Sequence, residues 1–163
     1  MQEKVEILKE AMDPPPLHIR KYEKNDFQEI ERLVTQLYEE FKDTDYFDDE
    51  LIDMKTYTQG YLQLPIYNML VAEKEKSLVG FILGEKITDE IYDILMHYVQ
   101  KEYRRQGIAS KLKEAMTAYA KQQGYKKIRS LVRSDNVASI QLNEKAKWEK
   151  EKIWYRYVKI LHP

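Results

Sequence analysis

The chain has 163 residues, of which 43% are hydrophobic and 34% charged, which suits one globular domain better than two. Its formal net charge is −1 and it has no cysteine, so we expect no nucleic-acid partner, no disulfide, no thiolate metal site and no cysteine nucleophile. No run approaches the roughly 18 apolar residues of a membrane span, and the histidines lack metal-ligand spacing. We therefore expect no membrane partner and no metal, and the lack of cysteine favours a cytoplasmic location.

The N-terminal residues read as an appendage to the domain. Val5, Leu8 and Met12 follow helical spacing, without the apolar core of a signal peptide, and the prolines 14–16 stop any helix. The pattern predicts an amphipathic appendage with a proline linker over 1–16 and a single domain over 17–163.

Strands and helices then alternate along the domain. Polar and apolar residues alternate over Leu17–Tyr22, which predicts a strand, and Asn25 and Asp26 offer N-caps for a helix over Phe27–Phe41. A weaker helix is predicted over Asp49–Tyr61. Later strands are predicted at Met69–Glu73, Leu78–Ile87, Ile91–Val99, Ile128–Val132 and Ile153–Leu161, and later helices from Gly107 to Gly124 and from Asp135 or Asn136 to about Lys147. This order predicts a mixed α/β (α+β) fold with a central sheet.

Charge is segregated along the chain. Residues 39–50 contain seven acidic residues and one lysine, whereas residues 101–133 contain ten lysines and arginines and two glutamates. An anionic cofactor and a cationic substrate would suit this arrangement, and two solvated surfaces of opposite sign would explain it equally well.

The segment Val99–Ser110 carries the most chemical information. A strand ends, a basic turn follows, and a helix begins near Gly107, where free N–H groups of the first turn make an anion site. The segment lacks the glycine-lysine-serine ending of a Walker loop and the three glycines of a dinucleotide-binding fold. A plain strand-to-helix connection with solvated arginines is the alternative.

Two patterns in the correct order resemble the GCN5-related N-acetyltransferase (GNAT) superfamily. Arg104-x-x-Gly107-x-Ala109 resembles its pyrophosphate-binding motif, and residues 136–148 resemble its Asn-x-x-Ala/Ser-x-x-x-Tyr-Glu-Lys-x-Gly-Phe segment. The resemblance covers about residues 17–161. It implies a mixed central sheet with splayed middle strands flanked by helices, acetyl-CoA as the acyl donor, and a homodimer as a common assembly.

The resemblance also implies roles for the cofactor-binding residues. The backbone N–H groups of the turn would hold the pyrophosphate, helped by the side chain of Arg104 or Arg105, and the backbone near Tyr98 and Val99 would pair with the pantetheine arm. Asn136 and Ser139 would contact the distal part of CoA. The residues of the turn are Arg105, Gln106, Gly107, Ile108, Ala109 and Ser110.

Three residues are candidates for catalysis. Asp93 lies where several family members place a base, although an exposed carboxylate near a turn explains it equally well. His97 is expected on the same strand face as Asp93 by simple alternation, where a buried hydrogen-bonded histidine is favoured over a catalytic one. Asn143 stands where the family has a tyrosine that acts as the acid. Its amide could hydrogen-bond the sulfur, but it cannot supply a proton.

These departures leave the acid of the reaction open. The proton donor to the thiolate is then Tyr98, Tyr103, Tyr155 or solvent. The family's closing Gly-Phe is Lys147-Trp148 in this chain, and the missing glycine predicts a different turn.

The favoured function is direct acetyl transfer from acetyl-CoA to a primary amine of a small molecule or peptide. The acidic residues 39–50 favour a cationic acceptor. The main alternative is a non-catalytic acyl-CoA sensor or interaction module with the same fold, suggested by Asn143. A nucleotide-binding regulator ranks lowest, because no magnesium-binding aspartates lie near the basic turn.

Overall fold

The structure is a computed structural model that describes residues 16–41, 59–60 and 62–151. The chain divides into two compact units, residues 1–131 and 132–163, and each is considered by itself. The expected appendage, most of the expected helix over 49–61 and the expected strand over 153–161 lie outside the described residues. Within the described part, no helix has the length and hydropathy needed to cross a membrane.

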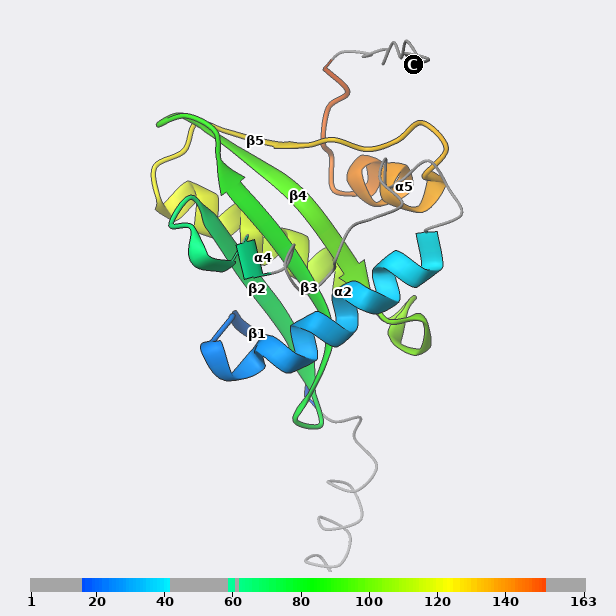
Figure 1. Cartoon of the computed structure of the whole chain (residues 1–163). Coiled ribbons are helices and arrows are strands. Elements are labelled where there is room, and N and C mark those ends of the chain that lie inside the picture. The colour runs from blue at the N-terminus through cyan, green and yellow to red at the C-terminus, as the bar shows by residue number, and fades with distance from the viewer. Residues whose placement is uncertain (1–15, 42–58, 61, 152–163) are drawn as a thin grey trace, which may run out of the picture. The chain divides into compact units, whose positions relative to one another are not determined.

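The first unit contains one five-stranded sheet with helices on both faces (Figure 1). The strand order is β1-β2-β3-β4-β5, with antiparallel pairing up to β4 and parallel pairing between β4 and β5. Helix α2 covers one face and α4 covers the other. The elements of this unit are β1 His18–Lys21, η1 Lys24–Asp26, α2 Phe27–Phe41, β2 Tyr67–Lys74, β3 Ser77–Lys86, β4 Ile91–Val99, η2 Lys101–Tyr103, α4 Ile108–Gln122 and β5 Lys127–Ser130. The mixed sheet and its flanking helices confirm the predicted fold class.

Apolar residues on one stripe of α2 form the core on its side of the sheet. Ile30, Leu33, Val34 and Leu37 recur at helical spacing and are fully buried. They pack against alternate residues of the strands, which share one face because side chains alternate along a strand. These strand residues are Met69, Val71, Leu78, Phe81, Leu83, Met96 and Tyr98.

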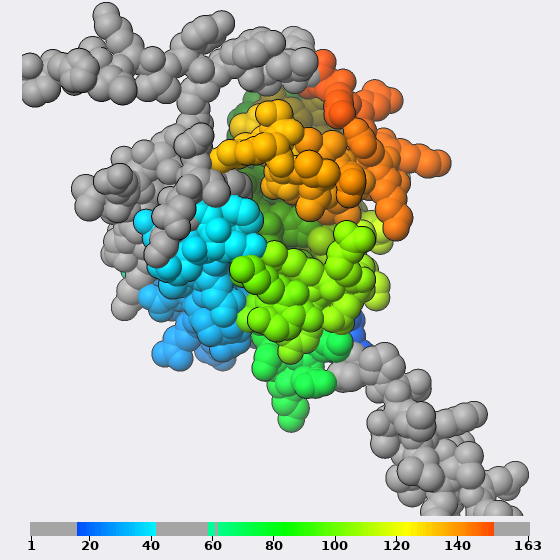
Figure 2. Space-filling model, turned by 90° about the vertical axis from the view of Figure 1, so that its right-hand side faces the viewer, coloured from blue at the N-terminus to red at the C-terminus, as the bar shows by residue number. Residues whose placement is uncertain are grey.

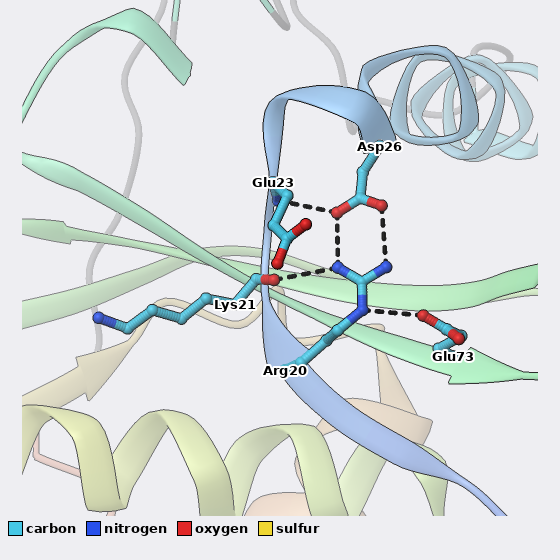
Figure 3. Close-up of polar contacts among 5 residues, drawn as sticks. All are labelled: Arg20, Lys21, Glu23, Asp26 and Glu73. Atoms are coloured by element: carbon cyan, nitrogen blue, oxygen red, sulfur yellow. Dashed lines mark hydrogen bonds and ion pairs between the residues drawn. The ribbon is translucent and has the colours of Figure 1, made fainter. Parts of the chain in front are cut away.

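An arginine fastens the corner between β1 and α2 (Figure 3). The Arg20 guanidinium donates to both carboxylate oxygens of Asp26, at 2.7 and 2.9 Å, and to Glu73 on β2 at 2.8 Å. Asp26 also accepts a hydrogen bond from the Glu23 backbone N–H at 2.8 Å. The expectation that Asn25 or Asp26 would be the N-cap is wrong, because helical structure already begins at Lys24 and Asp26 caps Glu23 from inside the first turn.

A β-bulge divides β4 into two parts that face opposite ways. Leu83 pairs with Met96 and Gly84 pairs with Ile94, so Leu95 is an extra residue. After the bulge, Met96 and Tyr98 face the α2 core. Before it, Tyr92 contacts Tyr119 of α4 edge to face, with ring centroids 5.9 Å apart.

The bulge corrects one expectation about the catalytic candidates. Simple alternation put Asp93 and His97 on one face of the strand. Asp93 pairs with Glu85, two residues after Leu83 on β3, and therefore lies on the α2 face. His97 pairs with Ile82 and lies on the α4 face. The two side chains are on opposite sides of the sheet because of the extra residue between them.

Strands β4 and β5 pair over a short length and then part. Their register runs from Ile91 with Lys127 to Ile94 with Ser130. The remainder of β4, from Leu95 to Val99, pairs with β3 on one edge and with no strand of the described residues on the other. This open edge is the splay that the family resemblance implies.

Candidate functional site

The turn between β4 and α4 presents backbone N–H groups at the start of a helix. Gly107 is the N-cap of α4 with φ of 79°, a left-handed conformation that favours glycine, and it has no side chain to cap the helix. The first turn of any α-helix leaves N–H groups without intrahelical acceptors. Arg105, also at positive φ (64°), is exposed beside them. Together they fit a pyrophosphate by charge and by hydrogen-bond donors.

Arg104 is engaged elsewhere. Its guanidinium donates to both carboxylate oxygens of Glu40 on α2, at 2.8 and 2.7 Å, and its Nε donates to the Val99 carbonyl at 2.8 Å. It also lies 5.5 Å from the centre of the Tyr98 ring. Between the two arginines proposed for the pyrophosphate, Arg105 is therefore the one whose guanidinium is exposed, and Arg104 joins the turn to α2.

The Glu40–Arg104 pair lies beside a cavity of about 290 Å³. Figure 2 shows this side of the first unit, where the cyan end of α2 meets the yellow-green segment that follows β4. The hydrogen bonds from Arg104 hold the pKa of Glu40 below its usual value. The cavity is lined by Gln36, Glu39, Glu40, Tyr98, Lys101 and Glu102, and carboxylates outnumber cations among these residues.

The open edge of β4 presents alternate backbone groups. Gln100 donates its N–H to Val79 on β3, and Arg104 reaches the Val99 carbonyl from the opposite side. Because backbone groups alternate in direction along a strand, Val99 and His97 point theirs toward the splay, and Tyr98 points its groups toward β3. An added extended chain would thus pair with Val99 and His97, while the backbone groups of Tyr98 are turned toward β3.

The Tyr98 hydroxyl forms a hydrogen bond with a residue of α2. It donates to Glu40 at 3.5 Å, and burial, followed by the negative charge of Glu40, raises the pKa of the phenol. Tyr103, another candidate proton donor, lies under Lys74, whose Nζ is 5.6 Å from the ring centre. Tyr155 lies outside the described residues.

His97 is half-buried on the face of the sheet that α4 covers, and a buried lysine lies near it. Burial lowers the pKa of His97 to about 4, so its ring is neutral at physiological pH, and its Nε2 has no hydrogen-bond partner among the described residues. Lys113 of α4 is also buried, which lowers the pKa of its amine to about 8. The sequence predicted a buried, hydrogen-bonded histidine, whereas His97 is half-buried and its Nε2 is unpartnered among the described residues. The sequence gave no sign of the buried lysine, because Lys113 lies among other lysines of α4.

Asp93 forms an ion pair with β5. Both of its carboxylate oxygens accept hydrogen bonds from Arg129, at 2.7 and 2.8 Å. On the neighbouring strand β3, Glu85 pairs with Asp93 and is half-buried. Its burial and the charge of Asp93 raise the pKa of Glu85. Sequence reasoning missed Glu85, although a signal was present: Phe81, Leu83 and Glu85 alternate on one face, so a carboxylate continues an apolar row.

In the second unit, the residues expected to contact CoA cap a helix. Asn136 is the N-cap of α5, Val137–Lys145, and its side-chain oxygen accepts the Ser139 backbone N–H at 3.0 Å. Asn143 lies on the last turns of this helix. Its carbonyl accepts the Trp148 N–H at 2.9 Å, and Glu144 accepts the Lys147 N–H at 3.0 Å.

This pattern of bonds is a Schellman motif. Lys147 occupies its left-handed position with φ of 60°. The expectation of a different turn is therefore wrong, because the lysine adopts the conformation that a glycine favours there.

Comparisons with known proteins agree with this geometry. The model of the acetyltransferase (GNAT) family matches residues 28–148. The chain belongs to this family. Membership of this family makes it an N-acetyltransferase. A comparison with curated protein sequences found no match.

Solved structures show the same fold at low sequence identity. Aminoglycoside N-acetyltransferase AAC(6')-Iy in complex with CoA is 17% identical, with a TM-score of 0.74 over 91% of this chain and 97% of that one. An aminoglycoside acetyltransferase from an uncultured soil metagenomic sample, in complex with sisomicin, is 17% identical, with a TM-score of 0.71 over 89% and 97%. A ribosomal-protein-alanine N-acetyltransferase from Brucella melitensis biovar Abortus 2308 is 18% identical, with a TM-score of 0.69 over 90% and 100%.

Proposed function

We propose that this acetyltransferase uses acetyl-CoA and transfers the acetyl group directly to a primary amine of a small molecule or peptide, and that this acceptor molecule is cationic. The observation that carries the proposal is the open edge of β4 beside the glycine-capped start of α4. An extended pantetheine chain fits the unpaired edge, and a pyrophosphate fits the helix N-terminus. Crystals of a structural neighbour with CoA support the same donor. Asn136 and Ser139 are kept as contacts of the distal CoA arm.

The cationic character of the acceptor rests on two observations. The cavity beside α2 is lined by Glu39, Glu40 and Glu102 against Lys101, and the charge of Glu40 is balanced by Arg104, so an excess of one carboxylate remains. A neighbour of the same fold was crystallised with sisomicin, an aminoglycoside. Negative potential at the mouth of a site raises the local concentration of cationic substrates. A small polyamine and a lysine-rich peptide would both suit this negative charge. The homodimer and the cytoplasmic location remain predictions.

The chain's own residues supply position and charge for the reaction. Backbone donors at the start of α4 and Arg105 neutralise the donor's phosphates, and the β4 edge orients the acyl arm in the splay. The attacking amine must lose a proton before it reacts. Asn143 stays a candidate hydrogen-bond donor to the sulfur, and solvent is the simplest proton source for the thiolate.

The test begins with isothermal titration of acetyl-CoA into the purified chain, followed by a free-thiol assay with a panel of amines. Arg105→Gln should weaken acetyl-CoA binding about tenfold, because a charge-assisted hydrogen bond to phosphate contributes roughly 1.5–3 kcal/mol. Lys121→Gln is the matched control, since it removes one charge from the last turn of the same helix. It should leave the affinity within about twofold. Equal losses in both variants would contradict the assignment of Arg105.

The acyl-CoA sensor remains the second candidate, because Asn143 stands where the family has a tyrosine and the Tyr98 hydroxyl is bonded to Glu40. Binding of acetyl-CoA without thiol release from any amine would establish it. Binding with thiol release would exclude it.

A further inference from the structure

Four polar side chains form a row across the sheet on the face that α2 covers. Tyr67 on β2 is opposite Glu85 on β3, Glu85 is opposite Asp93 on β4, and Asp93 is opposite Arg129 on β5. Opposite residues of neighbouring strands share a face, so the four side chains follow one another across the sheet. The last pair of the row lies one residue before Ile94 and Ser130, where β4 and β5 part. The row therefore ends at the base of the splay.

The two carboxylates of the row have different hydrogen-bond partners. Arg129 donates a short hydrogen bond to each oxygen of Asp93, so this carboxylate is held toward β5. Glu85 accepts a hydrogen bond from the Tyr67 hydroxyl, which leaves further acceptor positions on its carboxylate. Burial and the neighbouring charge of Asp93 raise the pKa of Glu85 above its usual value, which is the direction that strengthens a carboxylate as a base.

We infer that Glu85 is the general base that takes the proton from the acceptor amine, and that Asp93, held by Arg129, is a positioning residue that supports it through its charge. The inference rests on the proposed transferase function. It replaces Asp93 as the base, and it adds a residue on a strand where the sequence offered no catalytic candidate.

The proton balance of the reaction then closes. The ammonium gives one proton to Glu85, and the neutral amine attacks the thioester carbonyl carbon, which forms the N–C bond and breaks the C–S bond. The nitrogen loses its second proton as the amide forms, and the departing thiolate gains one proton to become free CoA thiol. Glu85 returns its proton to solvent, so one proton is released for each acetyl group transferred.

The experiment compares isosteric variants in the thiol assay, with acetyl-CoA and sisomicin or spermidine as the acceptor. Glu85→Gln should lower kcat about a hundredfold with little change in the affinity for acetyl-CoA, because a positioned base contributes roughly 10²–10⁴-fold. Glu85→Asp should restore part of the rate. Glu90→Gln is the matched control: it removes one carboxylate from the nearby turn, where Glu90 is exposed and paired with Lys126, and it should leave kcat within about twofold.

The pH profile separates a base from a structural carboxyl. A base must be ionised, so kcat/KM of the unmodified chain should rise with pH through the pKa of Glu85, and this limb should be absent in Glu85→Gln. The titratable and charged groups around Glu85 are Tyr67, Asp93 and Arg129 on the same face and Tyr92 on the other. Arg129→Gln should shift the limb rather than abolish it, because it changes the charge beside Glu85 and leaves the carboxylate in place.

Each outcome decides the inference. A Glu85→Gln variant that binds acetyl-CoA and keeps the full rate overturns the base while leaving the transferase intact. Loss of rate in Asp93→Asn with none in Glu85→Gln returns the role to Asp93. No thiol release from the unmodified chain with any amine overturns the transferase and the base together.

Discussion

Lys147 holds a conformation that costs a side chain free energy. Its φ of 60° lies in the left-handed region, just past the end of α5. Lys147→Gly should raise the free energy of unfolding of the second unit by about 0.5–1 kcal/mol, since glycine relieves the steric cost but loses more backbone entropy. Thermal unfolding measures the change. Gln141→Gly, in the interior of the same helix, should instead destabilise by about 1 kcal/mol. Destabilisation by both would contradict the assignment of the turn.

The turn of the β2–β3 hairpin is an element that uses unfavourable residues. Only Glu75 and Lys76 connect the strands, and both have positive φ, 52° and 63°. Two-residue turns with this geometry favour Asn-Gly. Replacing the pair by Asn-Gly should raise the midpoint of urea unfolding by an amount equivalent to about 1 kcal/mol, without changing the m-value. Glu75→Val, a β-branched residue at positive φ, should lower the midpoint.

Element by element, the sequence predicts most of the first unit because each pattern is local. The strand over Ile91–Val99 matches its predicted bounds, and the helix over Phe27–Phe41 matches its apolar stripe. The bulge at Leu95 was beyond prediction, because nothing in the residue order marks an extra residue in an otherwise regular strand. The extra residue places Asp93 and His97 on opposite faces of the sheet. It is revealed only by the pairing of Leu83 with Met96. A site built across strands therefore needs the register as well as the pattern.

For the candidate site, the sequence predicts the backbone features better than the side-chain partners. Gly107 and the start of α4 follow from the motif. The contacts of Arg104 with Glu40, which is 64 residues earlier, follow only from the packing of α2 against the segment after β4. Glu85 became a candidate only when the pairing of three strands placed it beside Asp93.

For the whole molecule, stability should fall with acid because of His97. Its pKa is about 4 in the folded chain and about 6.5 when unfolded, so the unfolded state binds the extra proton between these values. The free energy of unfolding should decrease as pH falls from about 6.5 to 4, by at most about 3 kcal/mol from this residue. The lowered pKa of Lys113, about 8, makes the free energy of unfolding depend on pH in a separate range, above about pH 8.

His97→Leu tests this contribution. The variant has a side chain of similar volume and no group to protonate, so its stability should change less between pH 6.5 and pH 4 than that of the unmodified chain. Chemical denaturation at several pH values measures both slopes. Equal slopes would show that His97 does not account for the acid sensitivity.

The anchoring of Arg104 to Glu40 and to the Val99 carbonyl bears on kinetics. A turn held through Arg104 to both α2 and the end of β4 is already shaped when a ligand arrives, so its conformational entropy is lost during folding and not during association. Encounter then needs no slow rearrangement of this segment. Acyl donors that differ beyond the pyrophosphate should consequently associate at similar rates, and discrimination among them should lie in how long each stays bound.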